Sequence, residues 1–419
     1  MAVLRRAAFR SLVALTLAAP GGCAAPDGRN NTSTQVEIES LAGRSWDSVV
    51  ARARGTTVLW RMWRGDASIN AFVDGWVAPR LGERFGITLE AVEGQGPEIV
   101  NALVTEREAG RGRGTASLVW INGETFSQLR QERLLAGPWS GRLPNGACVD
   151  SASAFVARDF GQDPAGYESP WGTVQFALIF DTARTPRPPR TVAELAGWIH
   201  AHPGRFTHDQ GFTGTTFLKG VMYALAGGVD KLQGGFDEGR YASARDTLFA
   251  WLRDLSPDFW RGGVTYPTEV AAMHRLFANG EIDFTMSYNH NEVVTKVRQG
   301  VLPPTSRALL LRDGTIANTH YVGIPFNAPN PAGAMVVADF LLSAEAQYEK
   351  QRPSVWGDGS VCARAALPAE WRARFATLDG DHLALAPDSL RRYARPEVAP
   401  EYHARLVNDW RRIIRGRER

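Results

Sequence analysis

Short apolar segments alternate with longer segments of helical periodicity through most of this chain. Residues 56–63 form the first apolar segment, and in the segment after it Phe72, Trp76 and Val77 recur at helical spacing. The alternation continues with strands expected at residues 87–92, 116–121, 172–182, 205–209, 281–288 and 321–325, and helices at residues 97–110, 124–137, 191–204, 215–228, 267–280 and 332–347. Because such alternation usually builds parallel sheets covered on both faces, it predicts an α/β fold with mainly parallel sheets. The 419 residues suffice for two such lobes.

The first residues have the pattern of an export signal. Three arginines within the first ten residues precede an apolar run at residues 12–19, which is too short to span a membrane. Two glycines then lead to Cys23, as in lipoprotein signals, although Pro20 stands where a large aliphatic residue is usual. We therefore expect an exported protein in which Cys23 is lipidated, or else is lost with the leader. Residues 24–34 are small and polar and are expected to form a tether.

Familiar catalytic and nucleic-acid-binding motifs are missing from the sequence. The glycine-rich residues 110–114 precede a strand, whereas a dinucleotide-binding loop follows one. We find no phosphate-binding loop, zinc-binding HExxH helix or GxSxG nucleophile motif. His200, His202 and His208 lie close in sequence but around a helix end, so we expect no metal ion. The net charge of +3 includes no block of like charge that would favour nucleic acid, and we expect no cofactor.

Four segments together resemble a known family. They are residues 116–139, a strand, polar loop and helix; residues 169–182, a strand between lobes; residues 278–292, a late strand and loop; and residues 319–347, a strand, a proline-rich turn and an apolar helix. Together they resemble the type 2 periplasmic binding fold, and within it the YnjB-like family of ABC-transporter substrate-binding proteins. The resemblance extends over roughly residues 55–360.

The resemblance implies a division of the chain into two lobes joined by two crossover strands. On this division residues 1–23 are the signal, residues 24–54 the tether and N-terminal segment, residues 55–173 plus 320–419 lobe 1, and residues 178–318 lobe 2. The crossovers are expected near residues 174–179 and 321–325. Cys148 and Cys362 would then both lie in lobe 1, where a disulfide between them would enclose all of lobe 2; both thiols staying free is the alternative.

Ligand contacts are expected just after strands, because clefts in such sheets lie beyond the carboxyl ends of the strands. This rule selects Trp63, Arg64, Asp66, Asn122, Gly123, Glu124, Thr213, Gly214, Thr215, Tyr288, Asn289 and His290, and the crossover and a late polar loop add Trp171, Trp356 and Asp358. Each has a structural alternative: an aromatic side chain can belong to the core, a carboxylate to the surface, and Thr213–Thr215 to a helix cap rather than to an anion site. We expect Asn122 and Tyr288 to face each other across one groove.

The resemblance implies binding without chemistry on the ligand. Two lobes would close over a small molecule and present it to an ABC permease and its ATPase, with the protein itself a monomer in the periplasm or at the cell envelope. Aromatic side chains with carboxylates favour a small polar or cationic organic ligand. The alternatives are an exported enzyme, such as a hydrolase, on the same scaffold, and a binding module for a membrane sensor.

Overall fold

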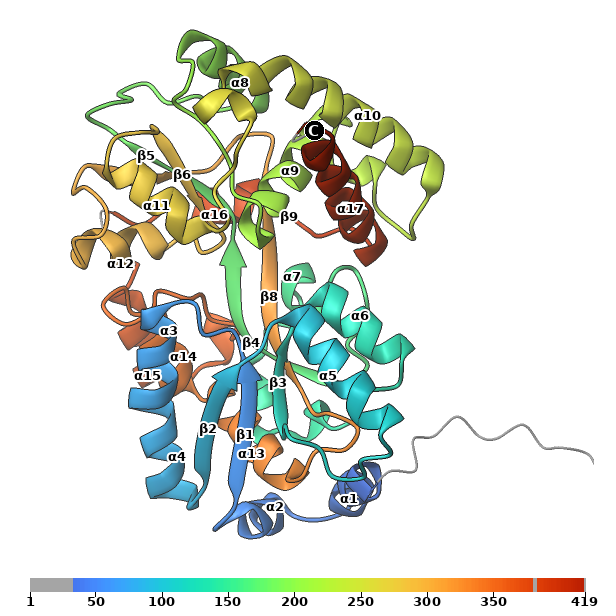
Figure 1. Ribbon diagram of the computed structural model, residues 1–419. Coiled ribbons are helices and arrows are strands. Elements are labelled where there is room, and N and C mark those ends of the chain that lie inside the picture. The colour runs from blue at the N-terminus through green and yellow to red at the C-terminus, as the bar shows by residue number, and fades with distance from the viewer. Residues whose placement is uncertain (1–32, 380–382, 418–419) are drawn as a thin grey trace, which may run out of the picture.

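The computed structural model describes residues 33–379 and 383–417 and has two lobes, each built around one sheet (Figure 1). The sheet of lobe 1 has the strand order β2 (Thr88–Glu93), β1 (Thr57–Met62), β3 (Leu118–Ile121), β8 (Thr315–Gly323) and β4 (Glu168–Gln175). The sheet of lobe 2 has the order β6 (Phe284–Ser287), β5 (Ala177–Asp181) and β7 (Ser306–Leu309). Figure 1 shows β4 and β8 running between the lower lobe 1 and the upper lobe 2.

Helices cover both sheets. Those of lobe 1 are α1 (Ser33–Ala42), α2 (Trp46–Ala53), α3 (Ala67–Phe72), α4 (Ala78–Phe85), α5 (Gly96–Glu108), α6 (Gly123–Gln131), α7 (Ala154–Ala157), α13 (Pro331–Leu342), α14 (Ala344–Gln351) and α15 (Ala369–Ala376). Those of lobe 2 are α8 (Val192–Ala201), α9 (Phe212–Leu225), α10 (Glu238–Leu255), α11 (Val270–Ala278), α12 (Glu292–Arg298) and α17 (Pro400–Arg417), with α16 (Pro387–Tyr393) before the two-residue strand β9 (Ala394–Arg395). None of the described helices is long and apolar enough to cross a bilayer.

The expectation of mainly parallel sheets is wrong. Among the described strands, only β1 with β2, β1 with β3, and β8 with β9 pair in parallel. Strand β8 runs antiparallel to both β3 and β4, and β5 runs antiparallel to β6 and β7 in the sheet of lobe 2. The reason is that β8 enters lobe 1 from lobe 2, opposite in direction to the strands it joins. Helix–strand alternation along the chain does not predict the direction in which a strand enters a sheet.

Two expected strands also differ from the structure. Residues 172–182 form two strands, because the chain leaves the sheet of lobe 1 after Gln175 and enters that of lobe 2 at Ala177. Residues 205–209 form no strand, and only Phe206 makes an isolated bridge, to Phe259. The carbonyl oxygen of Phe206 accepts instead from the amide of Trp260 in a neighbouring turn, so this segment lacks a full strand partner.

The apolar helix α13 is the centre of lobe 1. All twelve of its residues are buried, which fits a helix that is apolar on every side. Asn330 caps its first turn by accepting from the amide of Gly333 at 2.9 Å, and Pro331 occupies the first helical position, where no donor is needed. The prolines and asparagines before α13 therefore fix where the chain turns back into lobe 1.

The C-terminal part of the chain lies in lobe 2, unlike the expected division that gave residues 320–419 to lobe 1. Leu378 packs with the cluster around Cys362 in lobe 1, whereas Leu383 packs on the core of lobe 2. From α17, Tyr402, Leu406 and Trp410 are part of that core. The chain thus passes between the lobes a third time, and the apolar face of α17 packs on the core of lobe 2.

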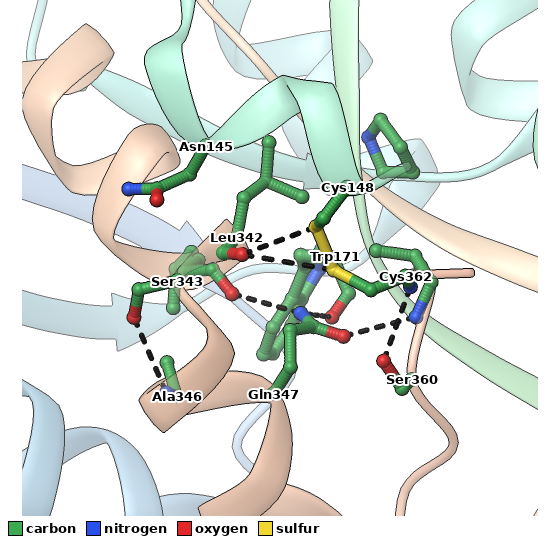
Figure 2. The surroundings of a disulfide bond; sticks show 12 residues. Asn145, Cys148, Trp171, Leu342, Ser343, Ala346, Gln347, Ser360 and Cys362 are labelled. Carbon is green, nitrogen blue, oxygen red and sulfur yellow. Dashed lines mark hydrogen bonds between the residues drawn. A yellow bond between two sulfur atoms is a disulfide. The ribbon is translucent and has the colours of Figure 1, made fainter. Parts of the chain in front are cut away.

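A disulfide joins Cys148 to Cys362 across 214 positions of the chain (Figure 2). Both sulfur atoms lie by the carbonyl oxygen of Leu342, at the end of α13. The bond therefore ties the loop before α7 to the loop after α14 within lobe 1, and the enclosed loop holds β4 to β8. Cys23 lies outside the described residues, and the chain expected as a tether is helical from Ser33, with Ile38 and Leu41 in the core of lobe 1.

Candidate ligand-binding site between the lobes

A cavity of about 660 Å³ lies between the two lobes. Its walls come from α6 and residues 154–162 of lobe 1, residues 233–236 of lobe 2, Ala317 and Asn318 of the crossover strand β8, and residues 396–401 of the C-terminal segment. Both lobes, the crossover strand β8 and the C-terminal segment thus contribute to one hollow. A volume of this size can hold a small organic molecule.

A buried ion pair forms part of the lobe 2 side. The ammonium group of Lys219, on α9, lies 2.7 and 2.6 Å from the two carboxylate oxygens of Glu397, and neither residue has appreciable exposed surface. The hydroxyl of Tyr288 donates to the same carboxylate at 3.1 Å. Burial and the Glu397 carboxylate together raise the pKa of Tyr288 well above its usual value. Tyr288 is therefore a neutral donor that Glu397 orients.

Lobe 1 reaches this pair through Phe160. The ring centroid of Phe160 lies 4.8 Å from the ammonium nitrogen of Lys219, within cation–π range. The ring also lies against Gly123, where an added β-carbon would stand 2.0 Å from it, so only glycine fits. Phe160 has φ 46°, and with Gly161 at φ 73° it makes the centre of a tight turn closed by two bonds between Asp159 and Gln162. A bulky side chain in this left-handed region costs on the order of 1 kcal/mol, which marks the turn as a site of constraint.

A second link between lobe 1 and the C-terminal segment lies beside Phe160. Glu124, at the start of α6, pairs with His403 of α17 at 3.2 Å. Although burial favours its neutral form, His403 lowers the pKa of Glu124 below its usual value. Phe212, at the start of α9, stands edge-on to Tyr288 with ring centroids 5.1 Å apart. It is one of few large apolar side chains that stay exposed, as a ligand-contacting ring would.

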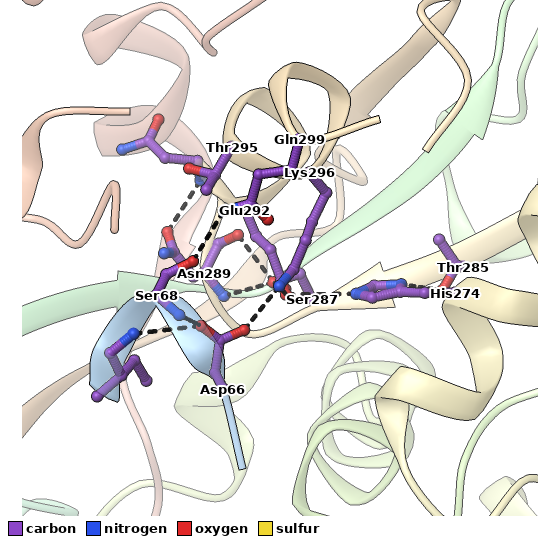
Figure 3. Close-up of polar contacts among 12 residues, drawn as sticks. Asp66, Ser68, His274, Thr285, Ser287, Asn289, Glu292, Thr295, Lys296 and Gln299 are labelled. Carbon is purple, nitrogen blue, oxygen red and sulfur yellow. Dashed lines mark hydrogen bonds and ion pairs between the residues drawn. The ribbon is translucent and has the colours of Figure 1, made fainter. Parts of the chain in front are cut away.

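Further from the cavity, α12 and its flanking residues hold lobe 2 against lobe 1 (Figure 3). Lys296 pairs with Asp66 of lobe 1 at 2.7 Å, and Gln299 donates to Ser68 at 3.1 Å. Asn291 and Thr295 donate to backbone carbonyls of lobe 1, at 3.0 Å to Gly357 and 2.9 Å to Pro353. We name these four side chains, Asn291, Thr295, Lys296 and Gln299, the α12 docking face.

The tryptophans and the acidic loop expected at the cleft are mostly core. Trp171 and Trp356 are buried in an aromatic cluster that also includes Trp120 and His320. Asp358 is fully buried between Lys350 at 2.9 Å and His320 at 3.1 Å. These residues support the floor between the lobes. Half-buried Trp120 and His320, which sequence reasoning did not select, are the members of this cluster nearest to solvent.

Several other expected contacts have partners within their own lobe. Arg64 pairs with Asp74, which lies in the helical turn between α3 and α4. Trp63 is half-buried against the core of lobe 1. At the start of α9, the carboxylate of Asp209 accepts from the amide of Gly211 at 2.7 Å. This side chain therefore supplies a negative charge near Thr213–Thr215, where a bound anion was the alternative expectation. An added β-carbon on Gly214 would meet the Asp209 carbonyl oxygen at 1.9 Å, so this glycine permits close backbone packing.

The remaining expected residues lie close to the lobe boundary. Half-buried Asn122 caps α6 without a side-chain bond, and the amide of Asn289 donates to Ser287 at 2.9 Å. His290 is half-buried, and burial lowers its pKa to about 4 while Asp358 of lobe 1 acts in the opposite direction. Glu124 and Tyr288 each contact the C-terminal segment, at His403 and at Glu397. That Asn122 and Tyr288 face each other across one groove stays a prediction.

Four residues at this site escaped the sequence reasoning: Phe160, Lys219, Glu397 and His403. Lys219 offered one signal, because it is among only four lysines and lies in an otherwise apolar helical segment. Glu397 and His403 offered none, since their segment was expected in lobe 1. Among the described residues, no group of three or more His, Cys, Asp or Glu side chains could hold a metal ion.

Residues 76–377 match the family of bacterial extracellular solute-binding proteins, and the chain belongs to that family. Among its relatives, Protein YnjB of Escherichia coli (strain K12) is 35% identical over 370 residues, which are 87% of this chain and 91% of YnjB.

Solved structures of solute-binding proteins share the fold. The periplasmic binding protein AfuA of Actinobacillus pleuropneumoniae, solved with fructose-6-phosphate bound, has a TM-score of 0.60 at 15% identity and covers 86% of this chain and 99% of its own. The spermidine/putrescine ABC-transporter protein PotD of Streptococcus pneumoniae also has a TM-score of 0.60, at 12% identity, and covers 86% and 99%. At such identities the likeness establishes the fold alone.

Proposed function

We propose that this protein binds a small cationic or polar organic solute between its lobes and delivers it to an ABC importer. The observation that carries the proposal is the cavity whose walls come from lobe 1, lobe 2 and β8 together. A ligand that contacts both lobes stabilises the closed form over the open one, and a permease can distinguish the closed form from the open form by its shape. The family is one of binding proteins, and we expect no chemistry on the ligand.

The charges near the cavity favour a cation. Glu397, Asp159 and Glu168 are buried carboxyl groups in this region. The cations are the buried ammonium of Lys219, which Glu397 holds, and the exposed Arg158 on the cavity wall. Phe160 and Phe212 add aromatic faces, on which organic cations bind well. Among the solved structures with this fold, one holds a sugar phosphate and another is named as a spermidine/putrescine transporter protein. The residues of the site, and not the fold, must therefore select the ligand.

Native mass spectrometry of protein purified from its host tests the proposal, followed by titration of the identified solute into stripped protein with small-angle scattering. We expect a bound organic molecule of low mass and a smaller radius of gyration when it binds. A protein that changes a bound molecule chemically, or that keeps one radius with every solute found, would contradict the proposal.

As a member of an extracellular solute-binding family, the protein works outside the cytoplasm. We further propose that Cys23 carries a lipid anchor, because two glycines precede it after an apolar run. Replacing Cys23 with Ser should release the protein from the membrane fraction into the soluble fraction. Wild-type protein that is already soluble and begins beyond residue 23 would exclude the anchor.

A further inference from the structure

Two carboxyl groups are buried without a partner beneath the turn that carries Phe160. Asp159 and Glu168 have 0% and 1% of their surface exposed, and none of their four carboxyl oxygens has a hydrogen-bond partner among the described residues. Buried carboxylates are normally paired, since desolvating an unpaired charge costs several kcal/mol. An orphan pair at such a position therefore indicates that a group which belongs there is missing.

Asp159 adjoins the cavity through its chain neighbours Arg158 and Phe160, which line it. Glu168 begins β4, opposite Gly323 of β8. It lies near enough to Asp159 that the Asp159 carboxylate disfavours its charged form. Glu397, which also lines the cavity, acts on Asp159 in the same direction.

The groups packed around the pair leave it short of positive charge. Arg130 of α6 is the cation that acts on Glu168, but its guanidinium stacks on Tyr167 with 3.4 Å to the ring centroid. Tyr321 of β8 gives its hydroxyl hydrogen to the carbonyl oxygen of Val156 at 2.8 Å. The backbone amide of Gly123 favours the charged form of Asp159 only in part. Lys219 on α9 is already held by both oxygens of Glu397.

From this geometry we infer that Asp159 and Glu168, with the face of Phe160, form the subsite for an ammonium or amidinium group of the solute. The inference rests on the proposed function and names the ligand chemistry of the same site. The position of Lys219 over the ring shows that a cation is accommodated at this face. A solute would reach the carboxyls when the lobes are open and the Phe160 turn moves, which also gives a reason for the constrained backbone of that turn.

Without a bound cation, both carboxyl groups carry protons. Burial raises the pKa of Asp159 and of Glu168 well above the usual values, and the charge of Glu397 acts on Asp159, and that of Asp159 on Glu168, in the same sense. A cation bound between the two groups favours their ionised forms. Uptake of the cationic solute near pH 7 therefore releases protons to the solvent, whereas uptake of a neutral solute at another part of the cavity does not.

Isothermal titration of the stripped full-length protein tests the inference, with three probes of similar length: putrescine as a diamine, 1,4-butanediol as its neutral analogue, and succinate as an anion. Each is titrated at pH 7 in phosphate and in Tris, whose ionisation heats differ. We expect putrescine alone to bind, with a heat that depends on the buffer. Asp159→Asn and Glu168→Gln should each weaken binding at least tenfold and remove the buffer dependence.

Asp163→Asn, which changes an exposed carboxylate on the same loop, is the matched control and should bind as wild type does. Melting temperatures separate affinity from folding. Because both carboxyl groups are buried and protonated without solute, the two amide variants remove no buried charge and should melt near the wild-type temperature. Unchanged affinity in both site variants, or tighter binding of butanediol or succinate than of putrescine, would overturn the subsite. If such a neutral or anionic solute closed the lobes, the proposed function would still hold and only the ammonium subsite would be wrong. If no solute from the host closed the lobes, both the subsite and the proposed function would be contradicted.

Discussion

At the scale of single residues, lobe 2 and its boundary with lobe 1 contain buried polar groups whose partners come from distant parts of the chain. Lys219 meets Glu397 across 178 positions, and Tyr241 donates to Asp409 across 168. Such pairs are weak evidence for stability, because desolvation offsets most of their attraction, but losing one partner leaves the other buried and unpaired. Single and double substitutions therefore give different results.

Replacing Glu397 with Gln should leave the ammonium of Lys219 buried without a counter-charge. We expect the free energy of unfolding to fall by about 3–5 kcal/mol, the usual cost of breaking a buried pair. The double variant Glu397→Gln with Lys219→Met should recover most of this loss, because no charge stays buried. Urea unfolding of the three proteins measures both effects, and a single variant as stable as wild type would show that water reaches Lys219.

His208 should make stability fall in acid. It is fully buried among Tyr266 and Trp410, its Nδ1 hydrogen is donated to the carbonyl oxygen of Asp209 at 2.9 Å, and burial lowers its pKa to about 4. The unfolded chain, with a pKa near 6.5, binds the proton first, so the stabilising contribution is complete above about pH 6.5 and is lost as the pH falls toward 4.

The free energy of unfolding should drop by up to about 1.4 kcal/mol per pH unit from this histidine. His208→Phe removes the titration, so urea unfolding between pH 7 and pH 4 should show a shallower slope for the variant. The same replacement at the exposed His202 controls for the loss of one histidine. Equal slopes in wild type and His208→Phe would mean that the site is open to solvent.

At the scale of elements, α12 and its flanking residues hold lobe 2 against lobe 1 through hydrogen bonds and an ion pair. Its docking face consists of four side chains that reach two segments of lobe 1, around α3 and after α14. Behind Lys296 stands Glu292, whose pKa is lowered to about 2 by His274 and Lys296 although burial favours its neutral form. Glu292, within the network of Figure 3, is therefore ionised at neutral pH and keeps its charge beside Lys296.

Weakening the α12 docking face should open the empty protein without touching the cavity. Lys296→Met removes the ion pair with Asp66, and Thr295→Val removes the bonds to the carbonyls of Pro353 and Trp356. We expect the combined variant to have a larger radius of gyration without ligand, and an affinity for its solute lower by about 1–2 kcal/mol since closure must be restored. Scattering curves identical to those of wild type would show that other contacts hold the lobes. Arg275→Met, at an exposed position of α11 in the same lobe, is the control.

At the scale of the whole molecule, the two ends of the chain are distributed between the lobes. The N-terminal helices α1 and α2 pack on lobe 1, whereas α17 packs on lobe 2, and the disulfide closes lobe 1 around the departure and return of the chain. Three segments of the chain pass between the lobes, and the chain after the last of them places Glu397 and His403 beside Lys219 and Glu124.

The disulfide should stabilise lobe 1 without being needed for the site. Replacing Cys148 and Cys362 with Ser removes a cross-link over 214 positions, and we expect a loss of about 2–4 kcal/mol in the free energy of unfolding. Solute affinity should stay within about twofold, because the bond lies at the end of α13 and outside the cavity. A large loss of affinity at unchanged stability would instead connect the disulfide to closure.

The sequence by itself determined the class of fold, most helices and the family, because periodicity and capping are local properties that nearby residues decide. It also supplied Tyr288 and Glu124, whose places after β6 and β3 follow from the rule that clefts lie beyond strand ends. The directions of β8 and β5, the third passage between lobes and the roles of Glu397, His403 and Phe160 were decided only by the tertiary structure. Each depends on which distant surface an apolar face or a buried charge contacts in the folded protein. The local order of residues along the chain does not specify that contact.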